Sequence, residues 1–141
     1  MRRIIVDSGS SIKVDEKKMY GVEILPIQLQ MGNDFFWDGV NLSTEEFYSR
    51  LKDSSQFPKT SLPSLEETQK LVDLYTGQGD EVLIITISSG ISGTYQTMKM
   101  LFNDYENVGS GVVGSTGRNI PSTPSPRAII PSMVSRIFII C

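Results

Sequence analysis

The sequence predicts an α/β protein with a mostly parallel sheet and crossover helices. Short apolar runs of strand length, at residues 3–7 and 82–87, alternate with segments whose apolar residues recur at helical spacing. Turn residues and helix-capping residues separate the two kinds of segment. Strands that alternate with helices in this way pair in parallel, because each helix returns the chain to the same end of the sheet.

The first third of the chain is predicted to form strands, a short helix and a hairpin. Residues 3–7 indicate a buried strand, and a short helix is expected from about residue 14 to residue 20. Residues 22–30 alternate partly between apolar and polar side chains, which predicts one strand with a wet face and Pro26 at an edge or bulge. Residues 32–39 then predict a turn and a hairpin.

Longer helices are predicted in the middle of the chain. Ser43 and Ser64 are each followed three residues later by a glutamate, which is the capping-box spacing of a helix start. The helix after Ser64 is expected from about residue 65 to residue 76. A strand at 82–87 and a helix from about 93 to 103 follow, so the alternation of strand and helix continues.

A hydroxyl-rich loop between the last two elements is the strongest functional signal. The segment SSGISGTYQ at 88–96 follows the apolar strand, and it contains Ser89, Ser92, Gly93 and Thr94. Its glycines let the backbone approach a ligand closely, and the new helix offers unpaired N–H groups. This combination suits a phosphate or a carboxylate, so the loop is a candidate anion site at the carboxyl edge of the sheet.

A second segment, PKTSLPSLEE at 58–67, is predicted to be another hydroxyl-bearing loop at the same edge. Thr60 and Ser61 stand before the helix start at Ser64 and carry free hydroxyls. The structural interpretation of both segments is capping and turn formation, the commonest role of serine and threonine before helices. Ser64 is assigned that role alone.

Several classes of site are disfavoured by composition. The 141 residues include no histidine, which excludes a Ser-His-Asp triad and a His-ligated metal, and the single cysteine is Cys141. No close spacing of acidic residues singles out a metal site, so neither a cofactor nor catalysis by this chain is expected. Asp7, at a strand end, is interpreted as a residue that accepts N–H bonds from neighbouring loops rather than as a catalytic one.

Charge and hydropathy suggest a cytoplasmic protein without nucleic-acid or membrane partners. Residues 1–106 hold all 16 acidic residues and 10 of the 13 basic ones, a net charge of −6. No apolar run approaches the roughly 18 residues of a membrane helix, and the start lacks the pattern of a signal peptide. We therefore expect no stable membrane insertion.

The composition changes after residue 108, which predicts a domain at 1–108 and an atypical Gly/Ser/Pro-rich tail at 109–141. One more strand is expected at the start of this segment. The last 35 residues contain no Asp, Glu or Lys and four of the seven prolines. Such a composition is compatible with a linker, an altered reading frame or a truncated product, and these alternatives stay open.

The loop at 88–96 fits neither the serine-hydrolase motif nor the nucleotide-binding phosphate-loop motif well. The G-x-S-x-G pattern of serine hydrolases would need glycine where Thr94 stands, and a histidine base as well. The phosphate-binding pattern G-x-x-x-x-G-K-[ST] would need a lysine after Gly93.

The order of motifs over residues 3–108 resembles the DegV family of bacterial fatty-acid-binding proteins. The motifs that carry this resemblance are Asp7-Ser8, Tyr20-Gly21-Val22, Asp38-Gly39-Val40, Glu46-Phe47-Tyr48, PKTSLPS at 58–64 and SSGISGTYQ at 88–96. The resemblance implies the N-terminal domain of a two-domain α/β protein. It also implies that Thr60 and Ser92 hydrogen-bond the carboxylate of a long-chain fatty acid.

Further properties follow from the same resemblance. DegV proteins do no chemistry themselves, and some present the acyl chain to a partner fatty acid kinase. This chain departs from the family pattern where the proline-rich tail replaces the continuation into a second domain. The alternative is therefore a half-domain without a ligand, present as an inactive fragment or a homo-oligomer.

Overall fold

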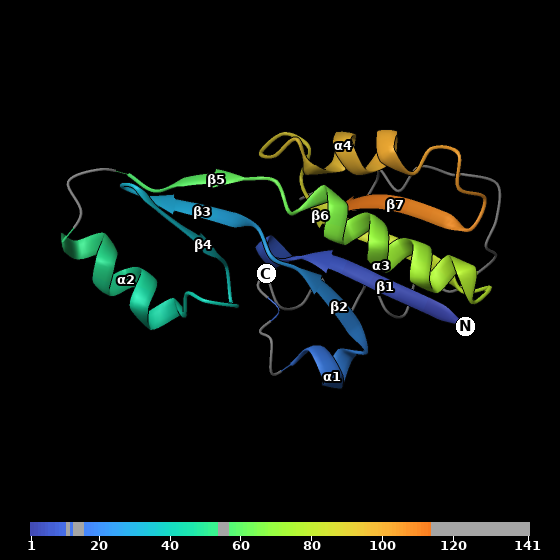
Figure 1. Ribbon diagram of the computed structural model, residues 1–141, viewed down its shortest axis with the longest axis horizontal. Coiled ribbons are helices and arrows are strands. Elements are labelled where there is room, and N and C mark those ends of the chain that lie inside the picture. The colour runs from blue at the N-terminus through green and yellow to red at the C-terminus, as the bar shows by residue number, and fades with distance from the viewer. Residues whose placement is uncertain (11, 13–15, 54–56, 114–141) are drawn as a thin grey trace.

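The computed structural model describes residues 1–10, 12, 16–53 and 57–113. These residues form two sheets, and the chain passes from one sheet to the other at residues 26–27 and returns at residues 62–64 (Figure 1). The larger sheet is parallel, and its strands in spatial order are β2 (Val22–Leu25), β1 (Arg2–Asp7), β6 (Glu81–Ile87) and β7 (Val108–Val113). The smaller sheet is antiparallel, with the order β4 (Asp34–Trp37), β3 (Gln28–Met31) and β5 (Lys59–Ser61). The predicted α/β class with a mostly parallel sheet is confirmed.

The two central strands of the larger sheet hold the core. β1 pairs in parallel with both β2 and β6, so that Ile5 lies opposite Glu23 on one side and Ile84 on the other. Helices α3 (Leu65–Gly77) and α4 (Thr94–Leu101) pack on one face of this sheet. Their buried residues on this face are Val72, Tyr75 and Met98, together with Phe102 after the end of α4.

The opposite face of the larger sheet has its own apolar cluster. Because successive strand residues point to opposite faces, Val6 and Ile85 lie on this side, next to Ile5 and Ile84 in sequence. Ile12, from the connection between β1 and β2, packs here too. The connection leads to β2, which lies on the other side of β1 from β6. Because crossovers between parallel strands are right-handed, this connection crosses the face of the sheet opposite to that covered by α4.

The prediction of one strand over residues 22–30 is wrong, because that segment forms β2 and β3 in two different sheets. Pro26 stands between them and has no N–H to continue a strand ladder. The predicted hairpin is confirmed, since β3 and β4 pair in antiparallel register with Gly32 at a φ of 63° in the turn. The chain therefore leaves the parallel sheet at Pro26.

The predicted helix starts in the middle of the chain are confirmed. The Oγ of Ser43 accepts the N–H of Glu46 at 3.1 Å, ahead of helix α2 (Thr44–Asp53). The Oγ of Ser64 accepts the N–H of Glu67 at 3.3 Å, ahead of α3. The first short helix, α1 (Lys17–Tyr20), ends at Gly21 as its sequence suggests; the start expected near residue 14 lies outside the described residues.

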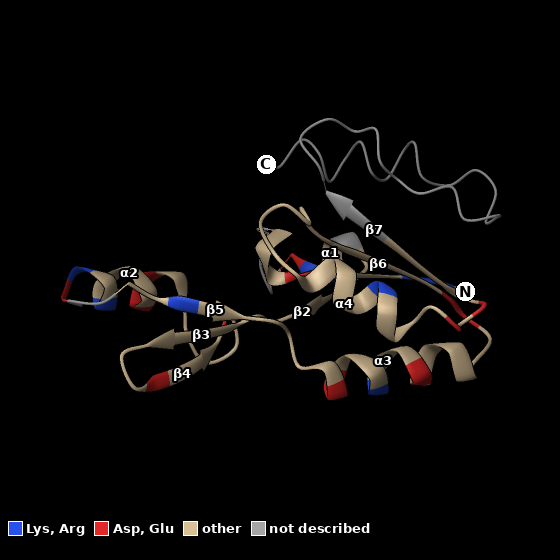
Figure 2. Ribbon diagram, turned by 90° about the horizontal axis from the view of Figure 1, so that it is seen from above, with Lys and Arg blue, Asp and Glu red and all other residues tan. Residues whose placement is uncertain are grey.

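The expected strand after residue 108 is confirmed, since β7 extends the parallel sheet from Val108 to Val113. The proposed boundary at residue 108 stays a prediction, and the tail from residue 114 onward lies outside the described residues. On the described surface, basic and acidic side chains are mixed along α2 and α3 (Figure 2). No described helix has the length and apolar character needed to cross a membrane.

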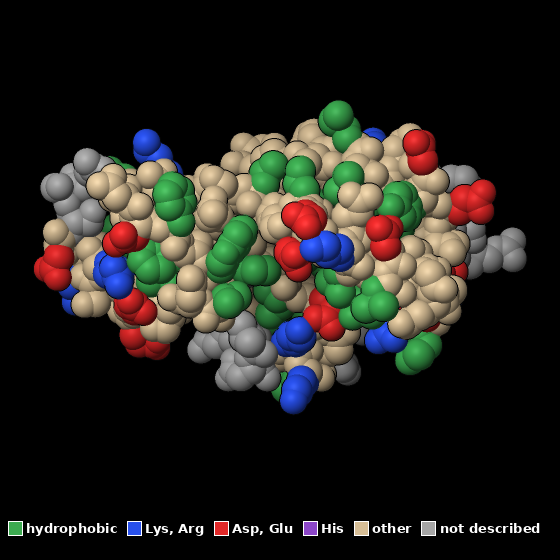
Figure 3. Space-filling model, viewed as in Figure 1, with side chains coloured by type: hydrophobic (Ala, Val, Ile, Leu, Met, Phe, Trp, Pro, Cys, Tyr) green, Lys and Arg blue, Asp and Glu red, His purple; other side chains and the backbone are tan. Residues whose placement is uncertain are grey.

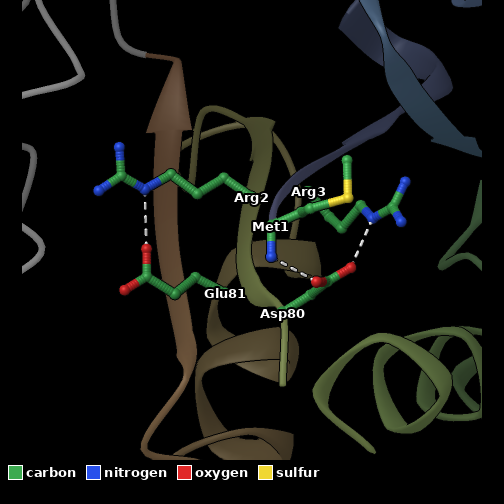
Figure 4. A network of polar contacts seen from close by, with 5 residues as sticks. All are labelled: Met1, Arg2, Arg3, Asp80 and Glu81. Atoms are coloured by element: carbon green, nitrogen blue, oxygen red, sulfur yellow. Dashed lines mark hydrogen bonds and ion pairs between the residues drawn. The ribbon is translucent and has the colours of Figure 1, made fainter. Parts of the chain in front are cut away.

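A polar network joins β1 and β6 at the amino end of the larger sheet (Figure 4). The carboxylate of Asp80 binds the Met1 α-amino group at 2.5 Å and the Nε of Arg3 at 2.8 Å. Asp80 is only 5% exposed, and hydrogen bonds from these two cations lower the pKa of its carboxyl group. Glu81, by contrast, pairs with Arg2 in solvent.

Asp80→Asn is expected to lower the free energy of unfolding at neutral pH but not in strong acid. Because the pKa of Asp80 is lowered by folding, its contribution is complete above the pKa of the unfolded chain and is lost as the pH falls through the folded value. Urea denaturation at pH 7 and near pH 2 measures the difference. Glu81→Gln is the control and should change little, because both partners of its ion pair are exposed.

Candidate functional site

The loop at residues 88–93 connects β6 to α4 at the carboxyl edge of the parallel sheet, as predicted (Figure 1). It is a compact turn held by its own groups. The carbonyl of Ser88 accepts the N–H groups of Ile91 at 2.9 Å and Ser92 at 3.1 Å, and the Oγ of Ser88 accepts the N–H of Gly90 at 3.2 Å. These hydrogen bonds give the loop a defined shape.

Ser92 and Thr94 form a hydroxyl pair at the beginning of α4. Their hydroxyl oxygens are 2.7 Å apart, and the N–H of Thr94 donates to the Oγ of Ser92 at 3.3 Å. Thr94 is 1% exposed, whereas Ser92 is half-buried and can be reached from outside. If the hydroxyl of Thr94 donates to Ser92, the Ser92 proton is left for an external acceptor. Thr94 then serves to orient Ser92.

Backbone donors accompany this hydroxyl pair. Gly93 is the N-cap of α4 and has no side chain to bond the first turn; its carbonyl accepts the N–H and the hydroxyl of Thr97. Within the described part of the chain, the N–H groups of Tyr95 and Gln96 have no hydrogen-bond acceptor. Free N–H groups at the positive end of a helix dipole attract anions.

Thr60 and Ser61 lie on β5, so the expectation that they belong to a loop is wrong. The segment is extended because it pairs with β3, with Thr60 opposite Leu29 and Ser61 opposite Gln28. Both residues are exposed. Adjacent strand residues point to opposite faces, so the two hydroxyls do not project from the same face of the smaller sheet.

The structure brings the two hydroxyl-bearing segments to different sheets. β5 belongs to the antiparallel sheet and leads from it towards α3, whereas the 88–93 loop belongs to the parallel sheet (Figures 1 and 2). Among the described residues, no hydrogen bond joins Thr60 or Ser61 to this loop. Ser89 is exposed and makes no side-chain hydrogen bond to another described residue.

Asp7 connects β1 to the start of the 88–93 loop. It is completely buried, and its Oδ2 accepts the N–H of Ile87 at 2.9 Å, which confirms the structural role expected for it. Burial raises the pKa of Asp7, and the backbone N–H groups of Ile87, Gly9 and Ser10 act against this rise. Its Oδ1 has no hydrogen-bond partner among the described residues.

The described residues contain no cluster of three or more Asp, Glu, His or Cys side chains that could hold a metal ion. The candidate site instead consists of hydroxyl and amide donors. Such donors can hold an anion by hydrogen bonds, and they provide no nucleophile with an adjacent base.

These observations define the class of protein as an α/β fold with a loop of hydroxyl and amide donors at the carboxyl edge of its parallel sheet. The model of the DegV family, described as an uncharacterised protein family, matches residues 1–117. The chain therefore belongs to the DegV family.

Relatives with known sequences agree with this assignment. The chain is 31% identical over 106 residues to a DegV domain-containing protein of Streptococcus pneumoniae, an alignment that covers 74% of this chain and 38% of the relative. It is 32% identical over 113 residues to one from Clostridium acetobutylicum, which covers 79% of this chain and 40% of that protein. The chain thus spans about two fifths of the length of these relatives.

Solved structures show the same fold. A stearic acid-binding protein from Eubacterium ventriosum superimposes with a TM-score of 0.67 at 29% identity, over 80% of this chain and 41% of that one. DegV of Bacillus subtilis, described as a fatty acid binding protein, superimposes with a TM-score of 0.69 over 78% of this chain and 39% of its own. At 24% identity, the second match supports the fold alone.

Proposed function

We propose that this chain binds a long-chain fatty acid and that the hydroxyls of Thr60 and Ser92 hold its carboxylate. The single observation that carries the proposal is the fold shared with the stearic acid-binding protein at 29% identity. Ser61, Ser89, Gly93 and Thr94 are assigned supporting roles, through backbone N–H groups or by orienting their neighbours. The chain acts as a carrier without chemistry of its own, and a partner fatty acid kinase receives the acyl chain.

The physical character of the loop supports an anionic ligand. The unbonded N–H groups of Tyr95 and Gln96 and the hydroxyl of Ser92 are neutral donors, so they bind a carboxylate without the cost of burying a cation beside it. Hydrophobic side chains are also visible over the region where the two sheets meet (Figure 3). An acyl chain needs such apolar surface beyond its carboxylate.

Native mass spectrometry of the purified chain tests the proposal, followed by identification of any released molecule. A fatty acid that copurifies, or palmitate taken up in one-to-one ratio, is the expected result. A chain that carries no lipid and takes up neither palmitate nor oleate would contradict the proposal. It would favour the alternative of a half-domain without a ligand, since the chain covers only 38–41% of the relatives compared above.

Ser92→Ala is expected to weaken palmitate binding about fivefold without abolishing it. A neutral hydrogen bond contributes about 1 kcal/mol, and the backbone N–H groups of α4 remain. Isothermal titration calorimetry measures the change. Ser49→Ala, an exposed substitution on α2, is the matched control and should bind as the original chain does. Unchanged affinity in Ser92→Ala would show that the carboxylate lies elsewhere.

A further inference from the structure

The last residue of β1 and the residue after it bind the segments that lead into both parts of the proposed site. On one side, the Oδ2 of Asp7 accepts the N–H of Ile87, the last residue of β6 before the 88–93 loop. On the other side, the Oγ of Ser8 accepts the N–H of Ile27 at 3.1 Å, directly before β3. Consecutive side chains therefore bind two segments that are about sixty residues apart in the sequence.

The residue that donates each of these two hydrogen bonds is close to one of the hydroxyl-bearing segments. Ile87 is followed by the turn that carries Ser92, and hydrogen bonds from the backbone and the Oγ of Ser88 hold that turn. Ile27 immediately precedes β3, the strand that pairs with β5, where Leu29 lies opposite Thr60. The hydrogen bonds at the carboxyl end of β1 thus connect the larger sheet to the beginning of the smaller one (Figure 1).

Gly9 makes the same junction tight by its lack of a side chain. A Cβ at this position would lie 2.6 Å from the Cγ2 of Ile87 and 3.2 Å from the Oδ1 of Asp7. The turn therefore packs directly on the end of β6, and the buried Oδ1 of Asp7 faces this contact. A methyl group here would displace Ile87 and the loop that follows it.

We propose that Asp7 and Ser8 are positioning residues of the ligand site, which fix the 88–93 loop and the β3–β5 sheet at one separation. Asp7 sets the position of Ser92 through Ile87, and Ser8 sets that of Thr60 through Ile27 and β3. Neither side chain is assigned a contact with the ligand. This inference rests on the proposed function, because it takes Thr60 and Ser92 as the residues that share one carboxylate.

The test compares palmitate affinity and amide hydrogen exchange in Asp7→Ala, Asp7→Asn and Ser8→Ala. Asp7→Ala leaves the N–H of Ile87 without an acceptor and should weaken palmitate binding about tenfold. Asp7→Asn keeps an oxygen that can accept this N–H, so most of the affinity should return. Asp80→Asn, a buried acid at the opposite end of the same sheet, is the control: it should lose stability and keep its affinity.

Hydrogen exchange separates failure of this inference from failure of the proposed function, because it needs no ligand. In the free protein, Asp7→Ala should speed exchange at residues 87–92, and Ser8→Ala at residues 27–31. Should the unmodified chain not bind palmitate, the proposed function fails, and the exchange rates still show whether Asp7 and Ser8 fix the two segments in place. The inference is overturned if exchange there stays unchanged, or if Asp7→Ala binds palmitate as tightly as the original chain.

Where Asp7→Ala does not fold, Gly9→Ala tests the same junction from the other side. Its φ is not in the left-handed region, so any effect comes from the close contact with Ile87. Faster exchange at residues 87–92 together with weaker palmitate binding supports the inference, and a folded Gly9→Ala variant without either change contradicts it.

Discussion

Decanoate is expected to bind this chain about three-thousandfold more weakly than palmitate. Each methylene moved from water into apolar surroundings contributes about 0.8 kcal/mol, and the two acids differ by about six methylenes. The total of roughly 5 kcal/mol exceeds the roughly 1 kcal/mol of the hydrogen bond from Ser92. Under the proposed function, we therefore expect acyl burial to determine the affinity and the hydroxyls to determine the orientation of the ligand. Titration calorimetry or displacement of a fluorescent fatty acid measures both affinities.

Hexadecanol separates the acyl chain from the carboxylate in this experiment. It has the length of palmitate without the charge, so its affinity reports burial of the chain alone. In Ser92→Ala the advantage of palmitate over hexadecanol should shrink, whereas the ratio of palmitate to decanoate should stay the same. Equal affinity for decanoate and palmitate would contradict acyl burial, and the proposal of a lipid carrier with it.

The elements of the larger sheet could be predicted because their signals are local. The apolar run before Ser88 and the serine that caps α3 act through residues within a few positions, and both are found as expected. Pro26 shows the limit of this reasoning. Its missing N–H indicates an interruption, but whether the strand bulges or the chain moves to another sheet depends on the partners of β3, which lie elsewhere in the sequence.

β5 could not be predicted for a similar reason. Residues 59–61 are a three-residue strand with no buried side chain, and they are extended only because β3 offers them a ladder some thirty residues earlier in the sequence. The sequence did identify Thr60 and Ser61 as residues with free hydroxyls. It could not show that one strand places them on opposite faces, which decides how each can contact a ligand.

The sequence predicted that Asp7 accepts backbone N–H bonds, but it could not predict the residue that donates them. Its position at a strand end suggested a carboxylate that accepts N–H bonds from loops. Its partner Ile87 is 80 residues away, so only the pairing of β1 with β6 brings the two together. The free N–H groups before Thr97 were, by contrast, predictable from the helix start alone.

Met98→Ala is expected to lower the free energy of unfolding by about 2–5 kcal/mol, the cost of emptying a fully buried methionine site. Met98 is 0% exposed and packs with Ile5, Ile84 and Phe102 under α4. For a domain with about a tenth of a kcal/mol of stability per residue, this is a large share, and the melting temperature should fall by on the order of 10 °C. Thermal and urea denaturation measure it.

Met100→Ala is the matched control for this prediction, because it removes the same side chain from the same helix at a position that is 80% exposed. Its free energy of unfolding should change by less than about 0.5 kcal/mol. The comparison bears on the proposed ligand site, since Met98 anchors the helix that begins just after Ser92 and offers the free N–H groups of Tyr95 and Gln96. If Met98→Ala were as stable as Met100→Ala, α4 would not be packed on the sheet. The donors at its N-terminus would then lack the fixed position that carboxylate binding requires.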